Sequence, residues 1–334
     1  INSQGINTSA VFGFTNTLLE VITKESPTHL AVVFDTQKPT KRHIEYPDYK
    51  AHREEMPEGL REALPYIDKL LEAFNIPKLF QDGFEADDVI GTLAKKAEQE
   101  GFQVFMMTPD KDFAQLVSEN IFMYRPANKW QSTAVWGEQE VLEKFQIQRI
   151  EQVIDFLAMM GDSADNIPGI PGVGKKTAQK FIAEFGSIEG LFQNSHKLKG
   201  RIKEKVETSQ EIGLLSKKLA TIITDVPIEF NAKEMLVVPK NLEKTNKLFH
   251  ELEFKNLLKR ILQVKSSIVE KPHNLPKKSP PHPSQLELFS PDTMSQNNSA
   301  HKKQCVIVDS YKQFLKATES IISQERIAIF IFPE

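Results

Sequence analysis

Hydrophobic residues in the first part of the chain alternate between helical spacing and short continuous runs. Apolar side chains recur at helical spacing over residues 6–25, and again at about 58–74 and 86–100. Between these segments lie short apolar runs, typical of strands buried in a parallel sheet, at 30–35, 78–80, 104–108 and 121–124. Strands that alternate with helices predict an α/β fold with a parallel central sheet flanked by helices.

Helical periodicity dominates the second part, where residues 138–160 and 187–262 are predicted to be helical, the latter with a break near residues 225–227. Between them, a tight turn from Gly172 to Gly174 opens a further helix that ends at about residue 185. Glycines let backbone amides approach an anion closely, and the helix N-terminus adds its dipole. Lys175 and Lys176 add positive charge to this predicted phosphate-binding turn. This pattern looks like a helix–hairpin–helix, which grips a DNA backbone without reading its sequence.

Acidic residues recur at the ends of predicted strands and at the start of the helix near residue 86. A preference for acids in a first helical turn explains one or two of them but not their recurrence along the chain. Like charges that gather repel one another unless a cation neutralises them, and carboxylate oxygens favour hard ions such as Mg²⁺ or Mn²⁺. We therefore predict one metal site built from Asp35, Glu85, Asp87, Asp88, Asp110, Asp112, Asp162 and Asp165.

Cations and aromatic residues are mixed in residues 36–57, which include Tyr49, Lys50 and Arg53. This mixture suits contact with phosphates and stacking on bases. On composition alone, a solvated surface loop is an equally good interpretation of the segment.

Composition narrows the class of protein only slightly. The 334 residues suffice for two ordinary domains, and the net charge of −3 argues against a generally basic nucleic-acid binder. Metal-binding acids can offset phosphate-binding lysines, so the charge does not decide the question. The single cysteine, Cys305, excludes an internal disulfide framework and a cysteine-built metal site. Because no apolar run is long enough to cross a bilayer, the expected location is the cytoplasm and no membrane partner is expected.

The C-terminal part changes character twice. Residues 266–303 are rich in Pro, Ser, Asn and Gln and are predicted to form a disordered linker. Within it lies an apolar island, residues 285–289, of the kind that docks into a groove on a partner. From residue 304 a new strand–helix–strand pattern begins, which we interpret as the incomplete start of another domain.

The combined motifs resemble the 5′-nuclease domain at the N-terminus of bacterial DNA polymerase I and the wider flap-endonuclease family. They are Val33-Phe34-Asp35, Phe84-Glu85-Ala86-Asp87-Asp88, Thr108-Pro109-Asp110-Lys111-Asp112, Gly161-Asp162-Ser163-Ala164-Asp165, and Gly172-Val173-Gly174-Lys175-Lys176. The resemblance implies a PIN-like core at 1–136 with an arch at 36–57, and a helical DNA-binding subdomain at 137–265 with its hairpin at 167–185. The linker at 266–303 and the segment 304–334 resemble the junction to the polymerase's proofreading-like 3′-5′ exonuclease domain.

The resemblance also implies roles for individual residues. Glu85, Asp87, Asp110 and Asp112 would hold two or more Mg²⁺ or Mn²⁺ ions, and the other four acids would ligate directly or through water. Lys50 and Arg53 are the expected catalytic cations, and K⁺ is expected at the hairpin. The expected DNA contacts are Arg42, Tyr49, Gly172, Gly174, Lys175, Lys176 and Thr177. The island resembles the pentapeptide that docks polymerases on the sliding clamp, through Gln285, Leu286, Leu288 and Phe289.

Two departures from the family pattern matter. The family begins with a strand that ends in a metal-binding Asp, and this sequence starts after that point, so one central strand and one ligand are expected to be missing. The proofreading exonucleases carry Asp-x-Glu after their first strand, whereas Pro333 and Glu334 stand here. Proofreading is therefore expected to be degenerate.

The expected function is a 5′-3′ exonuclease and structure-specific 5′-flap endonuclease that hydrolyses DNA and RNA primers by two-metal catalysis in replication and repair. Its expected substrate is duplex DNA with a 5′ flap or nick, bound by a monomer in the nucleoid. One alternative is a catalytically inactive DNA-binding module that recruits the polymerase to duplex and clamp. A metal-dependent phosphatase acting on small molecules is a third hypothesis, against which the hairpin and the cationic arch argue.

Overall fold

The computed structural model describes residues 1–126, 132–261 and, as backbone, 326–331. The predicted linker at 266–303 and its apolar island lie outside the described residues. Within the described part, none of the helices combines the length and the apolarity that a bilayer-spanning segment requires.

The described strands form one sheet in the order β2-β1-β6-β3-β4-β5. The strands are β1 (His29–Val33), β2 (Lys78–Leu79), β3 (Gln103–Met107), β4 (Ile121–Arg125), β5 (Ala134–Trp136) and β6 (Arg326–Ile331). All neighbouring pairs are parallel except β4 with β5, which closes one edge in the antiparallel direction. The predicted parallel α/β sheet is thereby confirmed, and its strand β1 is buried along its whole length, as its uninterrupted apolar run requires.

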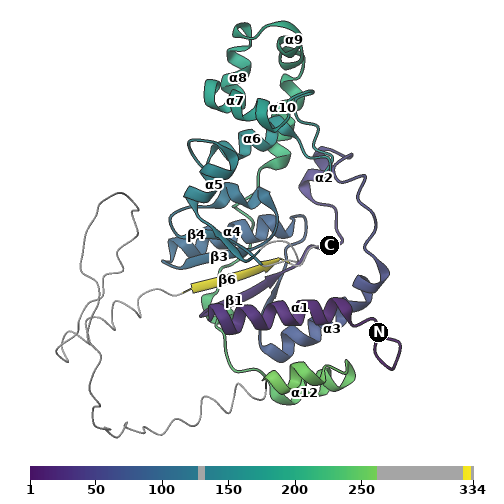
Figure 1. Cartoon of the computed structure of the whole chain (residues 1–334). Coiled ribbons are helices and arrows are strands. Elements are labelled where there is room, and N and C mark those ends of the chain that lie inside the picture. Colours follow the sequence, from purple (N-terminus) through teal and green to yellow (C-terminus); the bar gives the residue numbers. More distant parts are fainter. Residues whose placement is uncertain (127–131, 262–325, 332–334) are drawn as a thin grey trace, which may run out of the picture. The chain divides into compact units, whose positions relative to one another are not determined.

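Strand β6 differs from the sequence-based expectation. Residues 304–334 were predicted to begin a separate domain, but β6 lies between β1 and β3 and is parallel to both (Figure 1). It therefore occupies the central place where a strand was expected to be missing. The physical reason is the need for pairing: two central strands that faced an empty slot would leave backbone N–H and C=O groups without partners, and the apolar β6 supplies them.

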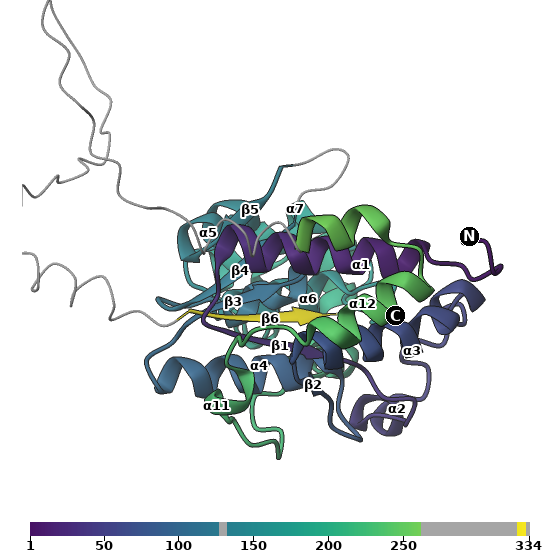
Figure 2. The same cartoon turned by 90° about the horizontal axis from the view of Figure 1, so that it is seen from below.

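Helices cover both faces of the sheet. On one side lie α1 (Ser9–Glu20) and α12 (Leu242–Glu251), and on the other lie α4 (Ala86–Gln99) and α11 (Ala232–Met235) (Figure 2). Helix α3 (Glu58–Phe74) packs against both α1 and α12. The short helix α2 (Lys41–Glu45), between β1 and α3 in sequence, belongs to the predicted arch. A π-helical turn, η1 (Val21–Glu25), extends α1.

A second group of helices gathers away from the sheet (Figure 1). It comprises α6 (Gln152–Met160), α7 (Lys175–Phe185), α8 (Ile188–Gln193), η3 (Ser195–Lys197), α9 (Gly200–Thr208) and α10 (Gln210–Ala220), and α5 (Glu138–Phe145) precedes it. The predicted break near residues 225–227 is confirmed and is longer than expected, because residues 221–231 are not helical and lie beside α4. There the backbone N–H of Val226 donates to the Thr92 hydroxyl at 3.1 Å.

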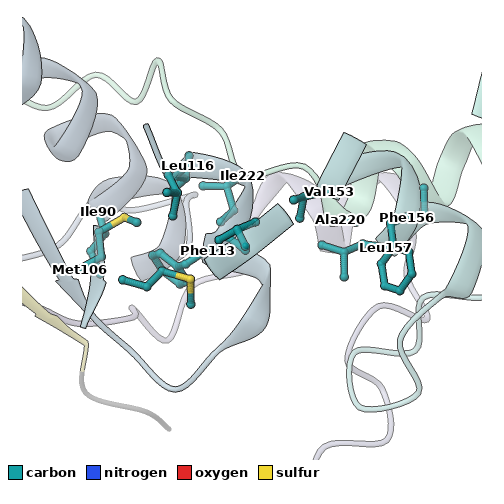
Figure 3. Packing of buried hydrophobic residues seen from close by; sticks show 14 of the residues in the cluster. Ile90, Met106, Phe113, Leu116, Val153, Phe156, Leu157, Ala220 and Ile222 are labelled. Atoms are coloured by element: carbon teal, nitrogen blue, oxygen red, sulfur yellow. The ribbon is translucent and has the colours of Figure 1, made fainter. Parts of the chain in front are cut away.

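One hydrophobic cluster joins the sheet to these helices. Figure 3 shows it passing from Ile90 and Met106 through Phe113 to the α6 residues Phe156 and Leu157. The described residues up to Lys255 and strand β6 accordingly belong to one compact unit. The predicted boundary between residues 136 and 137 thus does not separate two independent cores. This shared core fixes the helices relative to the edge of the sheet that carries the acids.

Candidate active site

The acidic residues gather where the parallel strands end. Asp35 follows β1, and its carboxylate accepts a 2.6 Å hydrogen bond from the backbone N–H of Ala86 in the first turn of α4. Asp110 follows β3 and caps the 3₁₀ helix η2 (Lys111–Leu116), accepting a 2.9 Å hydrogen bond from the backbone N–H of Asp112. Helix N-termini stabilise carboxylates in this way. The fold therefore brings acids from distant parts of the sequence to one edge of the sheet.

Several of the predicted site residues line a single cavity of about 760 Å³. Its walls include the carboxylates Asp35, Glu85, Asp87 and Asp110 and the cations Lys50 and Arg53. Most of the remaining lining comes from the segment before α3 and from the first turns of α3, and the rest comes from the loops after β1 and β3. These residues are Glu54, Glu55, Met56, Pro57, Arg61, Leu64, Gln37, Thr108 and Pro109. A cavity lined by both acids and cations has the charges needed to hold metal ions beside a phosphate.

Burial and the close approach of the acids raise the pKa of two of them. Burial raises the pKa of Asp87 well above its usual value, and the charges of Glu85 and Asp110 raise it further. Burial also raises the pKa of Asp112 to about 7, with a further contribution from the charge of Asp110. Carboxylates that resist ionisation in this way lack a sufficient cation close by.

A second loop brings two more acids. Asp162 and Asp165 lie in the turn after α6, where Gly161 and Gly169 cross at very short distance. A Cβ atom on Gly161 would lie 2.5 Å from the carbonyl oxygen of Ile167, and the φ angle of Gly161 is +71°. Only glycine accommodates both this contact and this backbone conformation. The glycine pair thus fixes the loop that carries both acids.

Three cationic side chains form ion pairs with acids of the site. Lys50 Nζ lies 2.9 Å from Glu85 Oε1, and Arg53 Nη2 lies 2.8 Å from Asp165 Oδ1. Lys111 Nζ lies 2.6 Å from Asp162 Oδ2. Burial alone would lower the pKa of Lys50, but the charges of Glu85 and Asp165 raise it above its usual value. The arch is thereby tied to both groups of acids.

Arg42 and Asp88 have a different environment from the one expected. Asp88 is 0% exposed and Arg42 5% exposed, and the guanidinium donates two hydrogen bonds to the carboxylate, at 2.7 and 2.8 Å. Arg42 also donates to the carbonyl oxygens of Leu219 and Thr221, while Asp88 accepts from the backbone N–H of Ile223. Neither side chain lines the cavity. The sequence suggested that Asp88 is a metal ligand and that Arg42 contacts DNA. The structure instead shows a buried ion pair that connects separate segments of the chain.

Tyr49 is likewise buried, at 3% exposure, and does not offer its ring for base stacking. Its hydroxyl lies 3.2 Å from Glu85 Oε2 and 3.4 Å from Asp165 Oδ2. Burial raises the pKa of this phenol, and the Glu85 and Asp165 charges raise it further, so Tyr49 stays protonated and can donate to the acids.

The glycine turn before α7 has the form expected of an anion-binding hairpin. Gly172 has a φ angle of +83°, and α7 starts at Lys175, directly after Gly174. Gly172, Gly174, Lys175 and Lys176 are exposed, and Thr177 is half-buried, whereas Val173 is buried and anchors the turn. The N-terminus of α7 thus faces solvent with two lysines beside it, which suits a phosphate.

The capacity to hold a metal can be judged from the donor atoms. Among the described residues, no three His, Cys, Asp or Glu side chains lie close enough to enclose an ion as they stand. One buried carboxylate oxygen, Asp112 Oδ1, has no hydrogen-bond partner in the described part of the chain. This orphaned oxygen, the raised pKa of two acids and the purely oxygen donor set fit a hard divalent ion. The residues that could hold the ion are the cavity carboxylates Asp35, Glu85, Asp87 and Asp110, together with Asp112, Asp162 and Asp165.

Sequence reasoning missed two polar residues of η2. Lys111 lies between two acids in the sequence, Asp110 and Asp112, and this position is a signal that could have indicated a role for it. Gln115 carried no local signal: its side chain donates to the carbonyl oxygen of Ala220 and accepts from the backbone N–H of Ile222, 105 and 107 residues away.

Comparison with known proteins identifies related chains. Residues 1–146 match the family described as 5′-3′ exonuclease, N-terminal resolvase-like domain, and residues 148–243 match 5′-3′ exonuclease, C-terminal SAM fold. A 5′-3′ exonuclease of Aquifex aeolicus is 39% identical over 259 residues, covering 78% of this chain and 87% of that protein. DNA polymerase I of Bacillus subtilis is 40% identical over 261 residues, covering 78% of this chain but only 30% of the polymerase. The chain thus spans about a third of the polymerases that it matches.

Solved structures with the same fold include two proteins in complex with DNA. The bacteriophage T5 D15 flap endonuclease, in a pseudo-enzyme–product complex with DNA and metal ions, aligns with a TM-score of 0.55 at 19% identity. That alignment covers 78% of this chain and 93% of the phage protein. The catalytic core of Rad2 in complex with DNA aligns with a TM-score of 0.51 at 14% identity, covering 74% and 80% of the two chains. At these identities the likeness supports the fold.

Proposed function

This chain belongs to the 5′-3′ exonuclease family, and from this premise we propose that it is a metal-dependent nuclease that cleaves duplex DNA at 5′ ends and 5′ flaps. The observation that carries the proposal is the cavity in which Asp35, Glu85, Asp87 and Asp110 face the same space as Lys50 and Arg53. We further propose that the chain is the nuclease part of a DNA polymerase I, acting on DNA and RNA primers in replication and repair.

The carboxylates would hold two or more Mg²⁺ or Mn²⁺ ions. Asp35, Glu85, Asp87 and Asp110 supply oxygens from the cavity wall, and Asp112, Asp162 and Asp165 supply them from the adjoining group. When bound, such ions acidify a water molecule and neutralise charge on the leaving oxygen. The raised pKa of Asp87 and of Asp112 is consistent with this role, because both carboxylates gain from a nearby positive charge.

The cations of the arch would bind the scissile phosphate. Lys50 contacts Glu85, and Arg53 contacts Asp165. Both side chains also line the cavity, so a shift of their charged ends brings them to a phosphate held there. Positive charge placed at that point stabilises the extra negative charge of the transition state. Tyr49, protonated and within hydrogen-bond distance of Glu85, would keep that carboxylate oriented.

The duplex would lie against the hairpin before α7, bound through its backbone. Gly172, Gly174 and Thr177 would let backbone amides reach a phosphate, and Lys175 and Lys176 would add charge. We also propose that K⁺ binds at this turn. Residues 285–289, which lie outside the described part, are proposed to bind the sliding clamp. The protein is further proposed to be a monomer in the bacterial cytoplasm.

Substitution at Asp110 tests the proposal. Asp110→Asn keeps the shape of the side chain but removes a charge from the cavity wall, so we expect cleavage of a flap duplex to fall by at least about a hundredfold while duplex binding is retained. The matched control is Asp82→Asn, which removes an acid whose ion pair with Lys38 is exposed. Equal loss of binding and cleavage in Asp110→Asn would contradict the metal-binding role.

A catalytically inactive DNA-binding module is the second candidate. It is favoured by the three cations that already rest on the acids and by the absence, among the described residues, of a preformed three-acid metal cluster. Binding of the duplex without cleavage in either Mg²⁺ or Mn²⁺ would establish it.

A further inference from the structure

We propose that Lys111 is a built-in counter-ion of the Asp112 and Asp162 carboxylates, which a divalent metal ion must displace, and that it thereby weakens metal binding in this half of the site. The inference rests on the proposed function, because it assumes that these acids hold a metal. It assigns a role to a side chain outside the set of acids and arch cations.

The geometry places one ammonium group between two acids from different parts of the chain. Lys111 Nζ lies 2.6 Å from Asp162 Oδ2 and 3.9 Å from Asp112 Oδ1. Lys111 is the first residue of η2, at the edge of the sheet, whereas Asp162 lies in the turn after α6. In the described part of the chain, the ion pairs of both acids run to Lys111. The ammonium group thus stands where a cation shared by the two carboxylates would stand.

The neutralisation that Lys111 provides is incomplete. Asp112 Oδ1 is buried and has no hydrogen-bond partner among the described residues, because the ammonium is too far from it for a hydrogen bond. Asp110, next to Lys111, adds a third carboxylate to this group. Three carboxylates around one ammonium leave excess negative charge, so a divalent ion gains more from this group than a lysine does.

Lys111 is also able to leave. Its side chain is 41% exposed, compared with 17% for Asp112 and 21% for Asp162. A lysine is a point charge on a flexible four-carbon chain, and it binds oxygen atoms without the fixed geometry of an arginine. A metal ion that binds Asp112 and Asp162 therefore has to break one ion pair, and the ammonium can move into solvent when it does so.

A purely structural tie between η2 and the turn after α6 predicts a different outcome. If Lys111 only positions the two acids, its removal misplaces them and metal affinity falls or stays the same. If Lys111 competes with the metal, its removal makes metal binding tighter. The sign of the change in affinity therefore separates the two roles.

The test is a titration of the full chain with Mn²⁺ in the absence of DNA, followed by calorimetry and by the electron paramagnetic resonance signal of free Mn²⁺. In Lys111→Met we expect the dissociation constant to fall by about twofold to fivefold, the factor corresponding to one partly exposed ion pair. Lys111→Arg, which keeps the charge, should stay near wild type. The control Lys95→Met removes a surface ion pair with Glu98 on α4 and should change nothing.

Each outcome decides the matter. Unchanged or weaker Mn²⁺ binding in a folded Lys111→Met overturns the inference, and flap cleavage by the wild type then still supports the proposed function. Absence of Mn²⁺ binding to the wild type overturns both. If Lys111→Met is unfolded without metal, the same titration of Lys111→Gln, which also removes the charge, decides the matter: tighter Mn²⁺ binding supports the counter-ion role, and unchanged or weaker binding overturns it.

Discussion

Replacing Arg42 by Met tests whether the Arg42–Asp88 pair holds the molecule together. Arg42 donates hydrogen bonds to Asp88 and to two carbonyl oxygens, of Leu219 at 2.9 Å and of Thr221 at 2.7 Å. Burial alone would lower the pKa of Arg42, but the hydrogen bond and the charge of Asp88 raise it, so the guanidinium is charged. The pair therefore connects α2, the start of α4 and the segment after α10.

The magnitude follows from what the substitution leaves behind. Asp88 is 0% exposed, and without Arg42 its carboxylate retains backbone N–H donors at Glu85 and Ile223 but no cation. Breaking a buried ion pair by removing one partner costs about 3–5 kcal/mol. Domains of ordinary stability have about 5–15 kcal/mol in total, so Arg42→Met should consume a large part of it.

The assay is equilibrium unfolding in urea at neutral pH, monitored by circular dichroism. With a denaturant slope of about 3 kcal/mol per molar, we expect the midpoint for Arg42→Met to fall by about 1–2 M. The double variant Arg42→Met with Asp88→Leu removes both charges, so its midpoint should lie between those of the single variant and the wild type.

An unchanged midpoint for Arg42→Met would refute the structural role. Loss of duplex binding in a variant of wild-type stability would show instead that Arg42 contacts DNA, as the sequence first suggested. A double variant less stable than Arg42→Met would show that the uncompensated charge of Asp88 is not the source of the loss.

Three further predictions follow from the site. The pKa of Asp112 is raised to about 7, so the protein without metal should lose stability as the pH rises from about 4 through 7. Melting temperatures in EDTA should show this decline in the wild type and a smaller decline in Asp112→Asn, in which the raised pKa of Asp87 still contributes. Gly161→Ala puts a Cβ atom 2.5 Å from a carbonyl oxygen at a position with a positive φ angle. We therefore expect the free energy of unfolding in urea to fall by about 1–3 kcal/mol and cleavage to be lost. The control Gly13→Ala, in α1 with open space around the new atom, should leave stability unchanged or raise it. Lys175→Ala and Lys176→Ala should each weaken duplex binding and reduce the slope of log affinity against log salt by about 1, and a slope equal to that of the wild type would place the duplex elsewhere.

The local features of the fold could be predicted from the sequence because they depend on short-range patterns. The apolar run ending at Asp35 predicts a buried strand, and the acids before Val89 predict the start of α4. Parallel strands end at one edge of a sheet, so the meeting of Asp35 and Asp110 also follows from the pattern. The structure agrees with this rule, because Asp35 and Asp110 line the same cavity.

Long-range partnerships could not be predicted in this way. Arg42 looks like a surface cation in the sequence, and only the contact with Asp88, 46 residues away, shows that it is buried. The apolar run at 327–332 indicated a strand but not its neighbours, because pairing with β1 and β3 depends on which sheet offers an unpaired position. The same holds for Lys111, whose partner Asp162 lies 51 residues away.

The most direct test of the central claim is cleavage of a duplex that carries a 5′-labelled single-stranded flap. The account predicts that the chain releases the labelled flap by a cut near its junction with the duplex, that EDTA abolishes the reaction and that Mg²⁺ restores it. Tight binding of the same duplex without a cut, in Mg²⁺ and in Mn²⁺ alike, would contradict the proposed nuclease and leave a DNA-binding module.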